Sequence, residues 1–184
     1  MSSTYTTANG IELINTGEQS GAWGDTTNTN LQIVDRVLTG IGSITLSGTA
    51  HTLTTTYGTL SEGMYRVLVL GGSPSGTNTI TVAPNDAQKT YMVYNNSGES
   101  AIFTQGSGAN VTVANGDAKL IYMDGAGTGA AVFDFTANLA MSSVNITGGV
   151  VNGVSSTGVA FTGDATFGDN DKAIFGAGSD LQIY

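Results

Sequence analysis

The sequence contains no cysteine, and it has only five basic residues against fourteen acidic ones. The missing cysteine excludes disulfides and thiolate metal sites, and it leaves the redox compartment open. Five scattered basic residues cannot form a patch that neutralises several phosphates at once, so we expect no nucleic-acid partner. The single histidine, His51, has no nucleophile motif near it. We therefore expect a half-exposed strand histidine there, and no enzyme activity.

Long hydrophobic runs are also missing. No apolar segment approaches the length that spans a bilayer, and the first ten residues have neither the basic nor the apolar region of a signal peptide. We expect no membrane contact and no secretory route.

Two short segments resemble ligand-binding motifs but lack residues that those motifs require. Residues 169–173 resemble the opening of a calcium loop, without the required glycine and distal glutamate. The glycine-rich run Gly125–Gly129 has no lysine after it and leads into a strand, which is typical of a hairpin turn rather than of a phosphate loop. We expect no metal and no cofactor.

Turn-forming and small polar residues are abundant instead. The chain has 27 glycines, whereas Leu, Ile, Val and Phe together make up about 23% of it and charged residues only 10%. Low hydrophobicity without high charge density does not fit a disordered tail. It predicts an ordered, mainly β protein that shares part of its core between subunits.

Residues 1–40 form the first of three expected regions, a short N-terminal arm followed by one amphipathic helix. The arm is polar apart from a few apolar side chains, which we take as candidate contacts with an attachment partner: Ile11, Leu13, Ile14 and Trp23. Trp23 has two interpretations, an anchor beneath the helix or an aromatic plug in a partner's pocket.

The helix is expected over residues 26–39. Leu31, Val34 and Leu38 form one stripe at helical spacing, which Ile33 and Val37 widen. Asp25 or Thr26 can cap its start, and Gly40 stands where a left-handed C-terminal residue belongs. The apolar face needs an oligomer or domain contact.

Residues 41–135 read as a second region of short strands, separated by Gly, Asn and Asp turns at intervals of about ten residues. This spacing is typical of a β-sandwich or jelly-roll-like domain. The expected strands are 43–46, 51–54, 64–70, 79–82, 90–94, 101–104, 111–113, 119–123 and 130–135. Tyr91, Tyr94 and Tyr122 could alternatively form a platform for sugar stacking.

Residues 136–184 form the third region, in which apolar residues are strung between glycines with too little bulk to build a core alone. We expect it to begin an intertwined trimeric β shaft, with Phe161, Phe167 and Phe175 at oligomer contacts. Because the sequence ends at Tyr184 within a strand-like run, we expect the full-length protein to continue beyond it.

Three segments carry a resemblance to a known family. Residues 9–31 resemble the N-terminal motif of tail fibres and related structural proteins of marine tailed bacteriophages. Residues 89–96 and 119–125 are similar to the β domain of that family, and residues 175–184 resemble the start of a repeat. The opening motif is the most specific of the three.

The resemblance implies a homotrimeric structural protein of the virion tail. Its residues 1–40 would bind a tail adaptor or nozzle protein, and parts beyond this chain would contact the host surface during host attachment. No catalytic residue carries over. Two alternatives stay open: a carbohydrate-binding module that acts directly on host glycans, and a capsid decoration protein.

Overall fold

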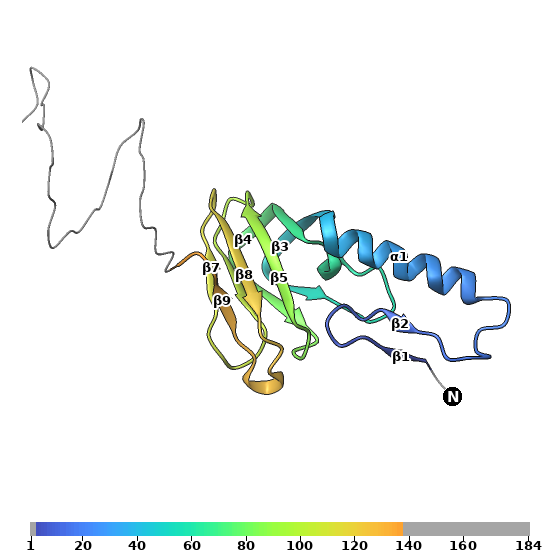
Figure 1. Ribbon diagram of the computed structural model, residues 1–184. Helices are drawn as coiled ribbons and strands as arrows, with labels where there is room; N and C mark the ends of the chain where they lie inside the picture. Colours follow the sequence, from blue (N-terminus) through green and yellow to red (C-terminus); the bar gives the residue numbers. More distant parts are fainter. Residues whose placement is uncertain (1–2, 138–184) are drawn as a thin grey trace, which may run out of the picture. The chain divides into compact units, whose positions relative to one another are not determined.

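The computed structural model describes residues 3–137, which belong to one structural unit that is mainly β with one α-helix (Figure 1). The elements follow the chain as β1 (Thr4–Tyr5), β2 (Glu12–Leu13), α1 (Trp23–Thr39), β3 (Ile41–Thr54), the 3-10 turn η1 (Glu62–Met64), β4 (Val67–Ala83), β5 (Lys89–Asn95), β6 (Ala101–Thr104), β7 (Val111–Val113), β8 (Ala118–Met123), the 3-10 turn η2 (Gly127–Gly129) and β9 (Val132–Asp134). The expected shaft, with Phe161, Phe167 and Phe175, lies outside the described residues apart from positions 136 and 137.

Seven strands make one mixed sheet around a central strand, β4. Along one edge β4 pairs with β3 in parallel, and along the other its first half pairs with β5 and its second half with β6. The sheet thus divides into two branches, one that begins with β5 and one that begins with β6. In the first branch β8 pairs antiparallel with β5 and β9 with β8, and in the second β7 pairs antiparallel with β6. The branches meet again, because Gly108 donates its backbone N–H to Ala130 O and Val132 donates to Ala109 O. The sheet is therefore nearly closed.

The long pair β3 and β4 corrects the sequence-based prediction of four separate strands in these segments. The Gly-Gly-Ser-Pro run at residues 71–74 is typical of a turn, but β4 continues through it in register with β3. Gly72 makes this possible: its φ is +98°, and a β-carbon there would lie 2.2 Å from Leu46 O. Between Gly48 and Ala50 the register shifts by a bulge.

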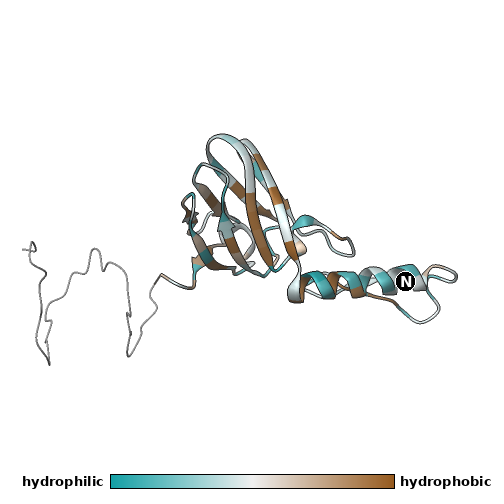
Figure 2. Cartoon of the chain, turned by 90° about the horizontal axis from the view of Figure 1, so that it is seen from above, coloured by the Kyte–Doolittle hydropathy of each residue, from teal (hydrophilic) through white to brown (hydrophobic). Residues whose placement is uncertain are grey.

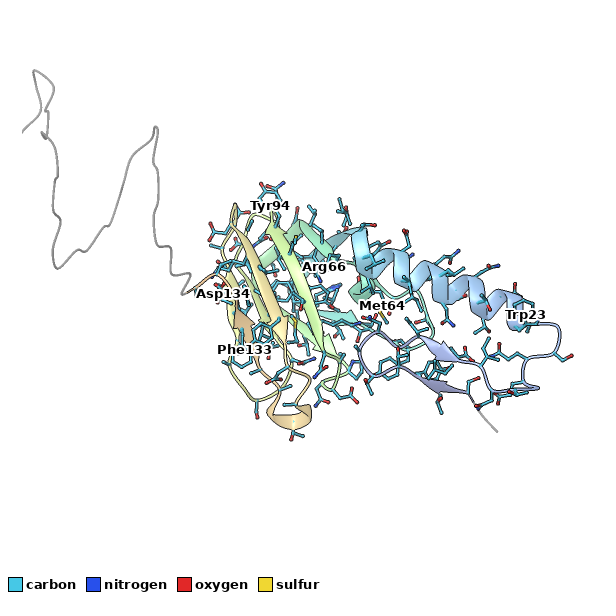
Figure 3. All side chains as sticks on the ribbon, viewed as in Figure 1. Trp23, Met64, Arg66, Tyr94, Phe133 and Asp134 are labelled. Atoms are coloured by element: carbon cyan, nitrogen blue, oxygen red, sulfur yellow. The ribbon has the colours of Figure 1, made fainter. Side chains whose placement is uncertain are left out.

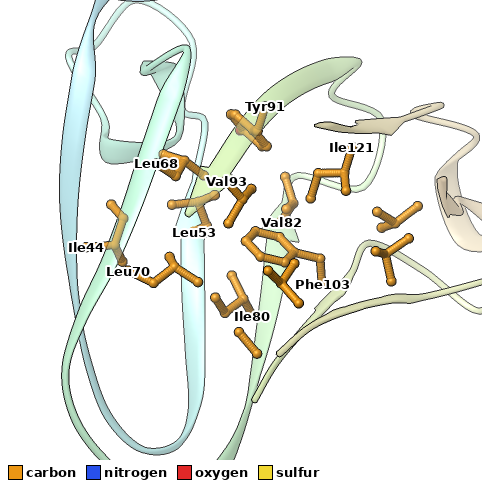
Figure 4. Packing of buried hydrophobic residues seen from close by; sticks show 14 of the residues in the cluster. Ile44, Leu53, Leu68, Leu70, Ile80, Val82, Tyr91, Val93, Phe103 and Ile121 are labelled. Atoms are coloured by element: carbon orange, nitrogen blue, oxygen red, sulfur yellow. The ribbon is translucent and has the colours of Figure 1, made fainter. Parts of the chain in front are cut away.

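The hydrophobic core is built from both halves of β3 and β4 and from the strands that pair with β4, together with β7, β8 and β9. Ile44 and Leu68 from the first halves and Leu53 and Ile80 from the second halves belong to the same buried cluster (Figure 4). Phe103 on β6 is fully buried among them. Alternate residues of each strand point to this cluster, as a pleated strand with one covered face requires.

Helix α1 confirms the predicted helix and its end at Thr39, but it corrects the predicted start and the predicted conformation of Gly40. It begins at Trp23 rather than at position 26, and no side chain caps its first turn. Gly40 has φ −66° and ψ 136°, an extended rather than a left-handed conformation. Glycine is required there by close approach, since a β-carbon would lie 2.7 Å from Arg36 O and 2.9 Å from the Tyr65 ring.

The N-terminal arm has more structure than its polar sequence indicates. Strands β1 and β2 form an antiparallel hairpin. Asn30 on α1 holds that hairpin by accepting from Glu12 N–H at 2.9 Å and donating to Glu12 O at 2.8 Å. Gly58 donates its N–H to Gly10 O at 2.7 Å, and the rings of Tyr5 and Tyr57 are in contact. These contacts tie the arm to α1 and to the segment between β3 and η1.

Candidate interaction surfaces

The outer face of the sheet, turned away from the core, is apolar across several strands. In the pairing register Ile41, Val67, Met92 and Leu120 lie side by side on β3, β4, β5 and β8. Phe135 extends the row, because its N–H donates to Leu120 O at 2.9 Å. Ile41, Met92 and Phe135 are exposed, and the other two are half-buried. We call this row, together with the aromatic residues described next, the outer apolar face.

Aromatic side chains flank the row. Tyr122 and Phe133 are register partners whose rings stack, with centroids 4.8 Å apart and planes 14° from parallel. Tyr94 lies beside Val69 on the neighbouring strand, and Figure 3 shows Tyr94 and Phe133 toward opposite ends of the sheet. Apolar and aromatic residues are characteristic of the central part of a protein interface, and Arg66 borders this face beside Tyr122 and Phe135.

Helix α1 has two apolar stripes, which separates residues that the sequence analysis had placed on one face. Ile33 is fully buried against the chain's own domain, and Val37 is half-buried. Leu31, Val34 and Leu38 are 62%, 36% and 67% exposed. Figure 2 shows apolar residues on the helix as well as on the strands. The predicted contact of these three residues is therefore not a contact within the described chain.

The exposed stripe has the spacing of a coiled-coil seam. Leu31, Val34 and Leu38 follow one another at intervals of three and four residues, which places them on one narrow line of the helix. We call this line the helix seam. Its geometry matches a partner helix of the same kind, as in a bundle around a symmetry axis.

The candidate attachment residues of the arm divide by exposure. Trp23 is 62% exposed and Leu13 49% exposed, whereas Ile11 and Ile14 are half-buried. Trp23 opens α1 as its first residue (Figure 3). Its exposure argues against the interpretation of Trp23 as an anchor beneath the helix and leaves the aromatic plug as the better one.

Lys89 joins the arm to the sheet, a contact between residues about eighty positions apart that the sequence analysis missed. The Lys89 ammonium donates to Ala8 O at 3.0 Å and lies 3.5 Å from both Asn9 Oδ1 and Met64 Sδ. All of these partners are neutral. Burial lowers the pKa of Lys89 to about 8.

The structure does not bring the three tyrosines of the suggested sugar platform together. Tyr91 is buried, and its hydroxyl donates to Gly63 O at 2.7 Å. Burial, with the charge of Glu62 as a smaller cause, raises the pKa of Tyr91 far above its usual value. Only Tyr94 and Tyr122 are exposed. The platform as predicted is therefore wrong, because alternate residues of β5 face opposite sides of the sheet.

His51 is confirmed as a half-exposed strand histidine. It lies on β3, and its Nε2 is 2.8 Å from Glu62 Oε1. Gly125–Gly129 is confirmed as part of the connection between two antiparallel strands, β8 and β9. A part-buried ion pair between Lys119 and Asp134, with Nζ 2.8 Å from Oδ2, joins β8 to β9.

Among residues 3–137, no three His, Asp or Glu side chains are grouped so that they could hold a metal ion. No helix in the same range is long and apolar enough to cross a membrane. Comparisons of the chain with protein-family models, with curated proteins and with solved structures found no match.

Proposed function

We propose that this chain is the proximal part of a homotrimeric bacteriophage tail fibre, a structural virion protein that joins the fibre to the tail and supports host attachment. The observation that carries the proposal is the helix seam, an apolar line at coiled-coil spacing that remains exposed at Leu31 and Leu38 and partly exposed at Val34 in the described chain. The resemblance of residues 9–31 to the opening motif of such fibres supports the same assignment.

In this proposal three copies of α1 pack in parallel through Leu31, Val34 and Leu38. The outer apolar face starts directly after the helix, at Ile41, so a trimer built on the helices could continue across the sheets. Three chains then bury together apolar surface that each exposes alone, and this burial is the driving force for assembly. The nearly closed sheet is proposed to be a sandwich or jelly-roll-like domain, and residues 136–184 to start the shaft.

The arm is proposed to be the contact with the tail adaptor or nozzle protein. Leu13 and Trp23 are its exposed apolar side chains, and a large aromatic that is free of its own domain suits a partner's pocket. A threefold fibre on a tail of higher rotational order meets unequal surroundings. We therefore expect the three arms to adopt different conformations when they are attached.

The oligomeric state tests the assembly. Sedimentation equilibrium of the full chain at micromolar concentration should show a trimer. Val34→Asp should shift the equilibrium toward monomer, because it places an unpaired charge in the apolar seam. Gln32→Asp, an exposed change on the same helix outside the seam, is the matched control and should remain trimeric. A stable wild-type monomer would contradict the proposal.

Attachment is tested separately with the double variant Leu13→Ser and Trp23→Ser. Because both side chains are exposed, the variant should fold and form trimers as the wild type does. It should, however, be missing from virions purified from cells that carry the altered gene. Normal incorporation of this variant, seen by immunoblotting of the particles, would refute the role of the arm but not the trimer.

The carbohydrate-binding alternative now rests on Tyr94 and Tyr122, which are exposed but lie at different positions along the sheet. It predicts glycan binding that these two side chains carry in the isolated protein. The capsid decoration alternative predicts labelling of the head rather than of the tail when a tagged chain is imaged on virions.

A further inference from the structure

A pocket of about 310 Å³ lies where the arm, the helix, η1 and the sheet meet. Asn9 from the arm, Val37 from α1 and Met64 from η1 form one part of its wall, and Lys89 and Tyr122 from the sheet form another. Arg66, which precedes β4, completes it (Figure 3). Its volume is at the lower end of the range for small-molecule sites.

The charge of this pocket is opposite to that of the chain. The protein carries a net charge of −9 and five basic residues, yet two of those five, Arg66 and Lys89, line this one pocket. No Asp or Glu is among the lining residues. Glu62, next to the lining residue Gly63, is a carboxylate that acts on Tyr91 in this wall, but the two cations outnumber it and leave a positive local field, which a partly enclosed site strengthens.

Neither cation is neutralised by the part of the chain that the structure describes. The Arg66 side chain is half-buried, and no hydrogen bond or ion pair from its guanidinium is formed among residues 3–137. Lys89 is only 8% exposed and contacts neutral groups alone. A buried cation with neutral partners is costly unless an anion can reach it.

The remaining lining residues suit a small polar ring. Tyr65, Tyr91 and Tyr122 are aromatic residues of the lining, and Asn9, Gln88 and Thr90 are polar ones. An aromatic wall beside a few polar groups is the usual composition of a site for a small organic ligand.

We propose that this pocket binds a small organic anion, a ring-containing molecule whose carboxylate or sulfate lies between Arg66 and Lys89. Arg66 binds the oxyanion through its planar fork of N–H donors, and Lys89 acts as the second charge. Because Lys89 also holds Ala8 O, a bound anion at this place contacts the residue that fixes the arm on the sheet.

The test is isothermal titration calorimetry of the full chain with D-glucuronate, D-glucose and sodium sulfate. We expect glucuronate to bind and glucose not to bind, and Arg66→Gln to weaken glucuronate at least about tenfold, the usual effect of losing a hydrogen bond to a charged group. Lys119→Gln removes a cation outside the pocket and should leave binding unchanged.

The other possible results of the titrations test the oxyanion site and the role of the ring separately. Sulfate binding as tight as glucuronate supports the oxyanion site and overturns the role of the ring. Equal affinities of Arg66→Gln and wild type, or no heat with any anion at millimolar concentration, overturn the proposal. Far-ultraviolet circular dichroism of Arg66→Gln, expected to match wild type, ensures that lost binding is not lost folding. Repeating the titration in the Val34→Asp background, which suppresses association, separates these outcomes from cover of Tyr122 by a trimer.

Discussion

The inner and outer faces of the sheet both carry apolar side chains, but only those of the inner face are buried by the rest of the chain. On β8, Ile121 points inward and is fully buried, whereas its neighbour Leu120 points outward and is half-buried beside exposed Met92. An antiparallel branch with one face in water normally carries polar residues on that face. Around Leu120 both faces are apolar, which indicates that this part of the outer face is suited to an interface rather than to permanent contact with water.

The strongest test of this comparison truncates two neighbouring side chains of β8, one on the inner face of the sheet and one on the outer face. Ile121→Ala should lower the free energy of unfolding by roughly 2–5 kcal/mol, because it opens a cavity in the core. Leu120→Ala should cost less than about 1 kcal/mol in the unassociated chain and should weaken association instead. Urea unfolding in the Val34→Asp background, which suppresses association, measures both. Equal losses would mean that the two faces are equally packed within one chain.

A second change tests the bend that brings both halves of β4 to one core. Gly72→Ala should destabilise the fold by roughly 2–4 kcal/mol, because it combines a strained positive φ with overpacking against Leu46 O. Gly71→Ala is the matched control, since no atom lies within 4 Å of a β-carbon there. The difference in denaturant midpoint between the two variants gives the result, and similar midpoints would contradict a tight bend.

Lys89 is a buried charged residue at the end of the inner face. Its contribution is tested by the pH dependence of the free energy of unfolding. Burial lowers the pKa of Lys89 to about 8 in the folded chain, from 10.5 for an unperturbed lysine. The unfolded state therefore binds more protons between these values, and stability should rise with pH from about 8 toward 10 by at most roughly 3 kcal/mol. Below pH 8 the full cost of burying the charge is present.

Tyr91 sets the upper limit of that window. Its pKa is raised in the folded chain, so above about pH 10 the unfolded state loses its proton first and stability should fall again. Unfolding free energies measured from pH 7 to 11 should therefore pass through a maximum near pH 10. Lys89→Met should remove the rise but keep the fall, and a rise that persists in this variant would exclude Lys89 as its source.

The smallest expected effect is on the outer face. Met92→Thr, again in the Val34→Asp background, should change the free energy of unfolding by no more than about 0.5 kcal/mol, because the side chain is exposed in the single chain. The same change in the wild-type background should lower the stability of the trimer. Thermal unfolding at two protein concentrations distinguishes the effects.

Sequence patterns were sufficient where structure is local. Strands 101–104 and 111–113 were predicted with their exact bounds, and the helix was predicted to within three residues, since alternation and helical spacing are properties of neighbouring residues. The continuous β4 was missed because its glycine-rich bend is held by β3, which is distant in sequence. The local pattern there is indistinguishable from that of a turn.

The candidate surfaces were predictable only in part. The helix seam could be identified from Leu31, Val34 and Leu38, but its separation from buried Ile33 depends on where the domain packs. The run of residues 91–94 is apolar or aromatic at four successive positions, which is a sequence signal that both faces of the strand are covered. Nothing local indicates that Lys89 holds Ala8, because that contact depends on the tertiary path of the arm.

The joint at Gly40 has a mechanical consequence. One residue separates α1 from β3, and Gly40 both donates its N–H to Arg36 O and accepts from the N–H of Arg66 and of Val67. A pull or twist applied to the N-terminal end of the helix meets no flexible linker that could absorb it. The load passes directly into the central strands of the sheet, so that bending at one end of the unit is transmitted as torque to the other.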